Sequence, residues 1–193
     1  FNDISNILGE KKVYFFPSTY KRSVQYDSTD QVNILMRAEC LSKLNSRNKN
    51  IVLVSYPEAL MEKVITRKSL NKNTLHLKTG EKISPEFLLE VLYEYEFERS
   101  DFVYEPGQYS IRGSIIDIFS YSGENPYRID FFGDEVESIR SFNIENQLSI
   151  EKLRSISIVP NIQEKLHNEN RDSFLNFLPS GTNIWMREPE FIL

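Results

Sequence analysis

The sequence predicts an α/β chain in which a small α+β domain, containing an antiparallel sheet, is inserted in an incomplete α/β domain. Three observations lead to this prediction. Strand-like and helix-like segments alternate in the first third of the 193 residues, a basic and polar stretch follows at 66–73, and strand-like runs with short connections follow at 101–142. We therefore expect a partial α/β segment at 1–73, an α+β domain at 74–157 and a returning segment at 158–193.

The first segment is expected to alternate strands and helices. Residues 11–16 read as a buried strand, and 51–55 have the aliphatic pattern of a parallel strand covered on both faces. Between them, apolar residues recur at helical spacing over about 30–45, after candidate N-caps at 27–30. A second short helix is expected over about 57–64, because a proline followed by an acid favours a helix start. The stretch at 66–73 is interpreted as a linker.

The middle segment is expected to be a helix packed on an antiparallel sheet. A short strand near Leu75 precedes a helix start at 84–86, where serine, proline and glutamate occupy capping and first-turn positions. Three strands are then expected, at 109–119, 127–132 and 135–142, and their short connections favour antiparallel pairing.

Two glycine positions are informative in these strands. Gly133 and the aspartate after it form a tight-turn signal between the second and third strands. Gly113 lies inside the first strand, where a glycine indicates a bulge or a close approach of another backbone. The returning segment is expected to contain a strand at 156–159, a short helix at 172–178 and the start of a strand at 184–186.

Composition argues against several kinds of site. With one cysteine and two histidines far apart, we expect no disulfide within the chain and no metal site. None of the seven glycines completes a phosphate-binding loop, so we expect no cofactor and no enzymatic activity in this segment. The net charge of −5 is a poor match for the DNA backbone. No signal peptide or long apolar run is present, and the expected location is cytoplasmic.

The distribution of cations points to a protein interface. No lysine occurs between Lys82 and Lys152, and all the cations in that stretch are arginines. Arginine is enriched at protein interfaces and lysine is depleted, because the guanidinium group is weakly hydrated and binds carboxylates through two parallel hydrogen bonds. The arginines concerned are Arg99, Arg112, Arg128 and Arg140.

Strand geometry then selects one sheet face. In the strand at 127–132, alternate side chains point to opposite faces. Tyr127, Ile129 and Phe131 are the expected core side. The outer side then carries Arg128, Asp130 and Phe132. A phenylalanine beside an arginine is the composition of an interaction hot spot. Arg112 on the preceding strand is expected to join the same face, and Gly113 is expected to let a partner approach the backbone there.

Other interpretations remain open from the residues alone. Arg128 could pair with Asp130 or with an acid across the strand, and Phe132 could pack beneath Phe102 or Tyr104. The Asp134–Glu135 pair would support an unrelated enzyme if it lay in a closed pocket. A continuous basic face would support a DNA-binding module, and its members would be Lys63, Arg67, Lys68 and Lys72.

Two long motifs resemble a known family. Residues 105–119 read EPGQYSIRGSIIDIF, and residues 125–140 read NPYRIDFFGDEVESIR. This combination is similar to the UvrB-homology module of bacterial transcription-repair coupling factors (Mfd), and UvrB shares a looser version of it. A weaker resemblance covers most of the remaining chain. The sequence departs from the family pattern at Ser114, where many members have glycine, and in the loop at 119–123.

The resemblance implies a fold and a partner. The outer segments would be parts of helicase-like domains 1A and 1B, and the middle segment would be domain 2, which resembles the domain of UvrB that binds UvrA. The family's UvrA-contacting positions fall on Arg112, Arg128 and Phe132. The expected supporting residues are Gly113, Asp130 and Gly133.

The implied function is recruitment of nucleotide excision repair to RNA polymerase stalled at DNA damage. The full-length family member would be an ATP-dependent DNA translocase, with RNA polymerase and double-stranded DNA as further partners and no membrane association. Within it, another domain is expected to cover the UvrA-binding face. The alternatives are a fragment of the UvrB excision-repair helicase and a DNA-binding module.

Overall fold

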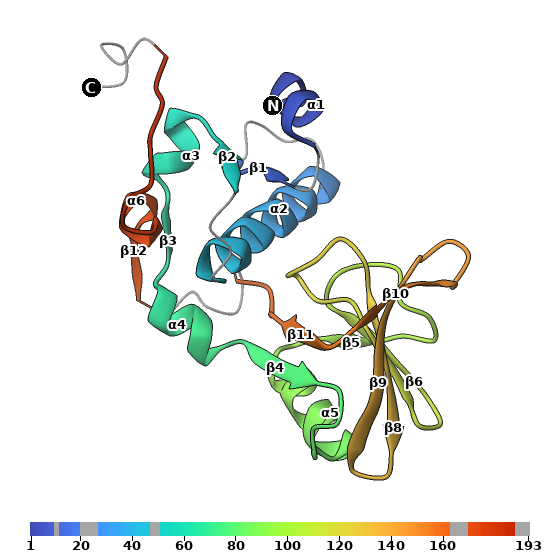
Figure 1. Cartoon of the computed structure of the whole chain (residues 1–193). Helices are drawn as coiled ribbons and strands as arrows, with labels where there is room; N and C mark the ends of the chain where they lie inside the picture. Colours follow the sequence, from blue (N-terminus) through green and yellow to red (C-terminus); the bar gives the residue numbers. More distant parts are fainter. Residues whose placement is uncertain (10–11, 20–26, 47–50, 163–169, 188–193) are drawn as a thin grey trace. The chain divides into compact units, whose positions relative to one another are not determined.

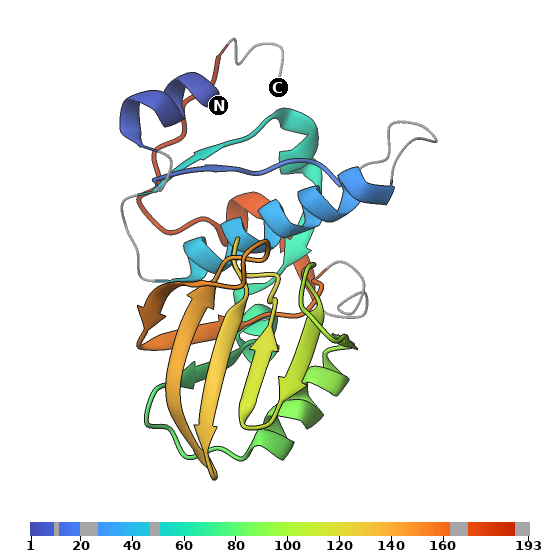
Figure 2. The ribbon, with the colours of Figure 1, turned by 90° about the vertical axis from the view of Figure 1, so that its right-hand side faces the viewer.

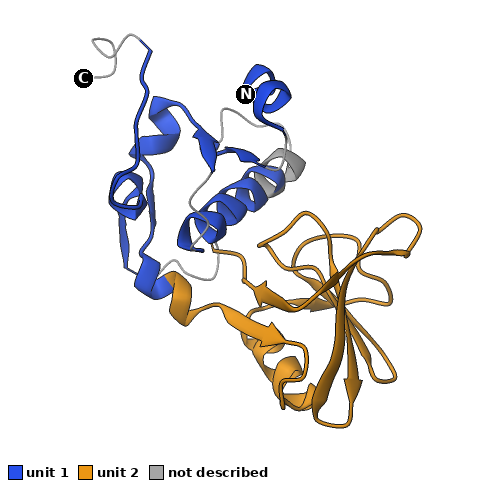
Figure 3. Cartoon of the chain, in the orientation of Figure 1, with its two compact units in different colours: residues 1–69, 169–193 blue, residues 70–168 orange. Residues whose placement is uncertain are grey.

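A computed structural model describes residues 1–9, 12–19, 27–46, 51–162 and 170–187, and for 27–31 the backbone alone (Figure 1). The chain divides into two compact units (Figure 3). Residues 1–69 and 169–193 form the first unit, and residues 70–168 form the second.

The first unit contains short strands with helices between them. β1 (Val13–Phe15) pairs in parallel with β2 (Val52–Val54), and β3 (Lys63–Ile65) pairs antiparallel with β12 (Arg171–Ser173). The helices are α1 (Asn2–Leu8), α2 (Asp27–Asn45), α3 (Pro57–Met61) and α6 (Phe174–Phe177), and α4 (Arg67–Lys72) crosses into the second unit.

The two parallel strands and the long helix confirm the predictions for 11–16, 51–55 and 30–45. β2 is half-buried, so within the described residues it is not covered on both faces as expected. The candidate caps at 27–30 lie outside the residues whose side chains are described.

Two predicted helices in this part of the chain are shorter than expected, one predicted linker contains a helix, and one predicted strand is absent. The helix at 57–64 ends at Met61, because Glu62 is already extended, and Val64 is buried in β3. The basic stretch at 66–73 contains helix α4, in which Ser69 and Leu70 are buried, and the division between the two compact units falls within it. The helix expected at 172–178 shortens to α6 because residues 171–173 pair with β3. Residues 184–186 form no strand.

A buried arginine holds part of the first unit together. Arg37 on α2 donates to the carbonyl oxygen of Pro17 at 2.6 Å and forms an ion pair with Glu62 at 3.1 Å. Burial opposes ionisation of Glu62, but hydrogen bonds led by that of the Thr19 hydroxyl, together with the charge of Arg37, hold the pKa of Glu62 below its ordinary value.

The second unit is built on a six-stranded sheet (Figures 1 and 2). Its strand order is β10-β9-β8-β7-β6-β5, so every strand lies beside its neighbour in sequence. All pairs are antiparallel except β5 with β6. The strands are β5 (Glu98–Arg99), β6 (Gln108–Arg112), β7 (Ile115–Ile118), β8 (Tyr127–Phe132), β9 (Glu135–Phe142) and β10 (Ser149–Leu153).

Helix α5 (Pro85–Glu94) packs against one face of this sheet (Figure 2). Ser84 caps the helix by accepting a hydrogen bond from the Phe87 amide at 3.2 Å, as predicted. Leu88 and Leu92 face the sheet and share a core with inward residues of β7, β8 and β9. The predicted helix on an antiparallel sheet is therefore confirmed. That core includes Ile116, Ile118, Ile129, Phe131, Val136 and Ile139.

The single strand expected at 109–119 is a hairpin of β6 and β7. The chain reverses at Gly113, which has a φ of +62°, a backbone conformation that favours glycine. A Cβ at Gly113 would meet nothing within 4 Å, so this glycine serves the turn and not a close approach. The predicted turn at Gly133 is confirmed, with a φ of +58° between β8 and β9.

A separate pair of strands connects an early and a late segment of the second unit. β4 (Leu75–Lys78) pairs antiparallel with β11 (Ser155–Ile158), and Leu75 lies opposite Ile158. Both strands confirm predictions from the sequence. Leu77 and Ile156 place this pair in the same core as α5 and the sheet.

Candidate functional site

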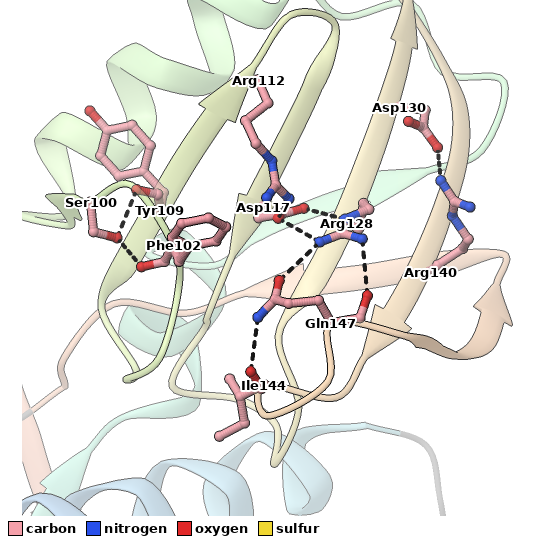
Figure 4. Close-up of polar contacts among 10 residues, drawn as sticks. All are labelled: Ser100, Phe102, Tyr109, Arg112, Asp117, Arg128, Asp130, Arg140, Ile144 and Gln147. Carbon is pink, nitrogen blue, oxygen red and sulfur yellow. Dashed lines mark hydrogen bonds and ion pairs between the residues drawn. The ribbon is translucent and has the colours of Figure 1, made fainter.

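The face of the sheet opposite α5 carries a cluster of arginines around one carboxylate (Figure 4). Arg112 reaches it from the end of β6, and Arg128 from the beginning of β8. Both side chains converge on Asp117, which lies on the strand between them. Two of the predicted residues, Arg112 and Arg128, are therefore brought together by an acid that the sequence analysis did not select.

Strand register explains why Asp117 and Arg128 meet. Asp117 lies directly opposite Arg128 in the β7–β8 pair, where side chains share one face of the sheet. Its neighbours Ile116 and Ile118 point into the core, so the alternation of the strand turns Asp117 to the other face. An isolated carboxylate between isoleucines is costly to bury, and the two arginines offset that cost.

The Asp117 carboxylate is almost completely buried, with 2% of its side chain exposed. Arg128 donates from Nε to one carboxylate oxygen at 2.8 Å and from Nη2 to the other at 2.9 Å. Arg112 forms an ion pair with Asp117 through its Nη2 atom. The hydrogen bonds to Asp117, the largest favourable cause, raise the pKa of Arg128 above its ordinary value despite partial burial.

Arg128 is held from a second side by the loop between β9 and β10. Its Nη1 donates to the Gln147 carbonyl oxygen and its Nη2 to the Gln147 side-chain oxygen, each at 3.3 Å. The guanidinium also lies over the ring of buried Phe142, 4.4 Å from the centroid. Only 14% of the Arg128 side chain is exposed. Arg128 is therefore a largely enclosed cation.

Arg112 is more accessible, with 38% of its side chain exposed. Its guanidinium carbon lies 5.6 Å from the centroid of the Phe102 ring, which is itself partly exposed. Asp117 and Phe102 are its two side-chain partners within the described part of the chain. Its Nε and Nη1 donors consequently have no partner among the described residues, on a side chain that solvent can reach.

Phe132 lies at the end of β8 with 79% of the residue exposed. The strand parity expected from the sequence holds here, because Ile129 and Phe131 are buried while Phe132 is not. This exposure contradicts the alternative in which Phe132 packs beneath Phe102 or Tyr104. An apolar side chain of this size on a sheet surface is available to a partner.

Asp130 belongs to a second ion pair on the same face. It pairs with Arg140 across the β8–β9 ladder and accepts a hydrogen bond from the Ser138 hydroxyl at 2.8 Å. The alternative in which Arg128 pairs with an acid across the strand is therefore confirmed, with Asp117 and not Asp130 as that acid. Gly113 and Gly133 lie in the two hairpin turns, next to Arg112 and Phe132 respectively.

Two residues of this cluster were missed from the sequence. Asp117 carried a usable signal, since an acid inside an apolar run needs a partner if it is buried. Gln147 carried none, because its place beside Arg128 depends on the path of a loop.

The structure bears on two of the remaining alternatives. Asp134 lies in the hairpin turn and Glu135 begins β9, and both are exposed, so they line no closed pocket. Of the candidate DNA-binding cations, Arg67 is committed internally, donating to the carbonyl oxygens of Leu44 and Phe177. The described residues contain no group of three or more potential metal-binding side chains, and no described helix has the length and apolarity to cross a membrane.

Comparison with known proteins places this sheet in a family. Residues 75–163 match the family described as the UvrB interaction domain. This part of the chain belongs to that family. The arginine cluster around Asp117 therefore lies on the outer sheet face of a UvrB interaction domain, together with Phe132.

Proteins named transcription-repair-coupling factor are similar to the chain beyond residues 75–163 as well. The protein of Bacillus subtilis is 33% identical over 181 residues, 93% of this chain and 15% of that protein. Those of Escherichia coli and Rickettsia conorii are 31% and 34% identical over 72% and 86% of this chain, or 12% and 15% of their own lengths. The resemblance seen in the motifs is thereby confirmed, and the chain spans about a seventh of the length of these relatives.

Proposed function

We propose that the outer sheet face of the second unit docks UvrA, and that this contact recruits nucleotide excision repair to RNA polymerase stalled at DNA damage. A role that links repair to transcription follows from the name of the relatives and from the UvrB interaction domain. UvrA as the partner rests on the motif resemblance and on the chemistry of the face. The residues proposed to serve docking are Arg112, Arg128 and Phe132, of which Arg112 and Phe132 have the accessible side chains.

One observation carries this proposal: an exposed Phe132 lies on the same sheet face as a guanidinium that is only partly satisfied inside the protein. Arg112 uses its Nη2 atom on Asp117 and keeps its other donors for a carboxylate outside. Phe132, 79% exposed, can enter an apolar pocket of a partner. A surface with these two properties matches an acidic patch that borders an apolar one.

ATP-driven translocation, RNA polymerase and double-stranded DNA belong to the same proposal for the intact protein. They rest on family resemblance, because the chain spans about 15% of its relatives' length. The cofactor-free, non-enzymatic character expected of this segment is likewise a proposal. In this view the second unit acts by binding.

Calorimetric titration of the chain with UvrA tests the docking role. We expect binding that weakens by about ten- to a hundred-fold, or about 1–3 kcal/mol, in Arg112→Ala and in Phe132→Ala. Neither change removes a core contact, so both variants should retain the wild-type circular dichroism spectrum.

Two substitutions serve as matched controls. Tyr93→Ala removes an aromatic residue of similar exposure from α5, on the opposite face of the sheet. Arg154→Ala removes an exposed arginine just after β10. Both should bind UvrA like the wild type. A folded wild-type chain that does not bind UvrA, or controls that weaken binding as much as Phe132→Ala, would remove the proposal.

A further inference from the structure

The hydrogen-bond donors of Arg128 are nearly all used inside the protein. A guanidinium group has five N–H donors. Arg128 uses the Nε donor and one Nη2 donor on Asp117, and the second Nη2 donor and one Nη1 donor on Gln147. One N–H remains, on a side chain that is 14% exposed. Arg128 can therefore offer little to a partner directly.

The loop that carries Gln147 is braced to hold this position. Gln147 has a φ of +60°, which is unfavourable for a residue with a side chain. Its amide nitrogen donates to the Asn143 carbonyl oxygen, and its side-chain nitrogen donates to the Ile144 carbonyl oxygen, both at 2.9 Å. A strained residue persists only where the surrounding contacts over-determine it, and such residues gather at functional positions.

Arg128 in turn limits how Arg112 binds Asp117. The fork of Arg128 occupies both oxygens of the Asp117 carboxylate. Arg112 is left with one bond through Nη2, to an oxygen it shares with Arg128. Without this competition, Arg112 would itself form two parallel bonds to Asp117, the preferred arrangement of an arginine and a carboxylate. Its free donors would then turn inward.

We propose that Gln147 is a positioning residue of the docking surface: by fixing Arg128 on Asp117 it keeps the donors of Arg112 facing outward, toward carboxylates of the partner. The proposal rests on the proposed function in one respect, the identity of that partner. It divides the two arginines by role, with Arg112 as the contacting residue and Arg128 as its support.

A partner-free measurement tests the first half. Exchange of the arginine Nε hydrogens with solvent is followed by NMR in the chain, in wild type and in Gln147→Gly. Glycine tolerates the positive φ and keeps the backbone carbonyl acceptor, so only the side-chain contacts are lost. We expect the Arg128 Nε hydrogen to exchange more slowly than that of Arg112. Gln147→Gly should raise the exchange rate of the Arg128 Nε hydrogen by about fivefold, as loss of one hydrogen bond predicts. Equal exchange of the two arginines in wild type, or no change in Gln147→Gly, would overturn the proposal.

A double-mutant cycle with UvrA tests the second half. Gln147→Gly should weaken binding by about three- to tenfold in the wild-type background and leave it unchanged in an Arg112→Ala background, because its effect passes through Arg112. In a Phe132→Ala background it should weaken binding by the full factor. Equal weakening with and without Arg112 would overturn the division of roles. If wild type does not bind UvrA at all, the proposed function fails, while the NMR result still decides whether Gln147 positions Arg128.

Discussion

Replacing Asp117 by asparagine should strongly destabilise the second unit. The substitution keeps the size of the side chain and one acceptor oxygen, and it removes the negative charge between two arginines. Arg128 then faces an amide nitrogen or a single oxygen where it had a carboxylate. Because Asp117 is buried, water cannot replace the lost bonds.

The size of the effect follows from the burial of the pair. Removing one partner of a buried ion pair costs about 3–5 kcal/mol. The lower end applies here, because the 14% exposure of Arg128 lets water reach it and its two bonds to Gln147 survive. We expect a loss of about 3 kcal/mol in the free energy of unfolding, which moves a urea midpoint by about 1.5 M at a slope of about 2 kcal/mol per molar.

Urea titration followed by the amide NMR signals of β6–β9 is the suitable measurement, because these signals report the second unit alone. Asp134→Asn is the matched control, since it makes the same chemical change at an exposed turn position. The control should stay within about 0.5 kcal/mol of the wild type. If Asp117→Asn shifts the midpoint no more than Asp134→Asn does, Asp117 does not organise the arginine cluster.

Three further predictions concern stability. Glu62→Gln should lower the free energy of unfolding by about 1–3 kcal/mol near pH 7, because buried Arg37 loses a charged partner. The pKa of Glu62 is lowered in the folded state, so the stability that its charge contributes is complete above its ordinary pKa of 4.5 and is lost as pH falls through the folded pKa. The free energy of unfolding should therefore fall less steeply with decreasing pH in the variant than in the wild type. The same steepness in both proteins would contradict this. Gly107→Ala should cost about 1–3 kcal/mol by thermal unfolding, since φ is +89° and the new Cβ would lie 2.7 Å from the Tyr121 hydroxyl oxygen; a neutral result would refute the clash. Phe132→Ala should leave the unfolding midpoint within about 0.5 kcal/mol of the wild type, and a larger loss would indicate a packing role.

Local patterns predicted the parts of the sheet where alternation and turn chemistry agree. β8 and β9 follow from the alternation of Ile129 and Phe131 with polar residues and from the glycine turn at Gly133. The hairpin of β6 and β7 was missed because apolar alternation continues through Gly113, which therefore resembled a glycine inside one strand. A glycine in a short turn and a glycine in a bulge give the same sequence pattern when the flanking residues are all strand formers.

The arginine cluster could be predicted only in part. Parity within one strand placed Arg128 and Phe132 on the outer face, as the structure has them. The partner of Arg128 depends on the register between strands, which places Asp117 opposite Arg128, although Asp130 is closer to Arg128 in the sequence. The position of Gln147 depends on a loop whose conformation no periodicity encodes. The helicase-like assignment of the flanking segments to domains 1A and 1B stays a prediction.

The pairing of β4 with β11 has a mechanical consequence. Leu75 begins β4 and Ile158 ends β11, and the two residues lie opposite each other, so the chain enters and leaves this two-stranded ladder at the same end. Tension applied through the flanking chain would therefore break the hydrogen bonds between β4 and β11 one residue pair at a time, starting at Leu75 and Ile158, and would not load them all at once. Because Leu75 and Ile158 lie opposite each other, a host protein would need to span only a short gap to carry residues 75–158 as an inserted domain.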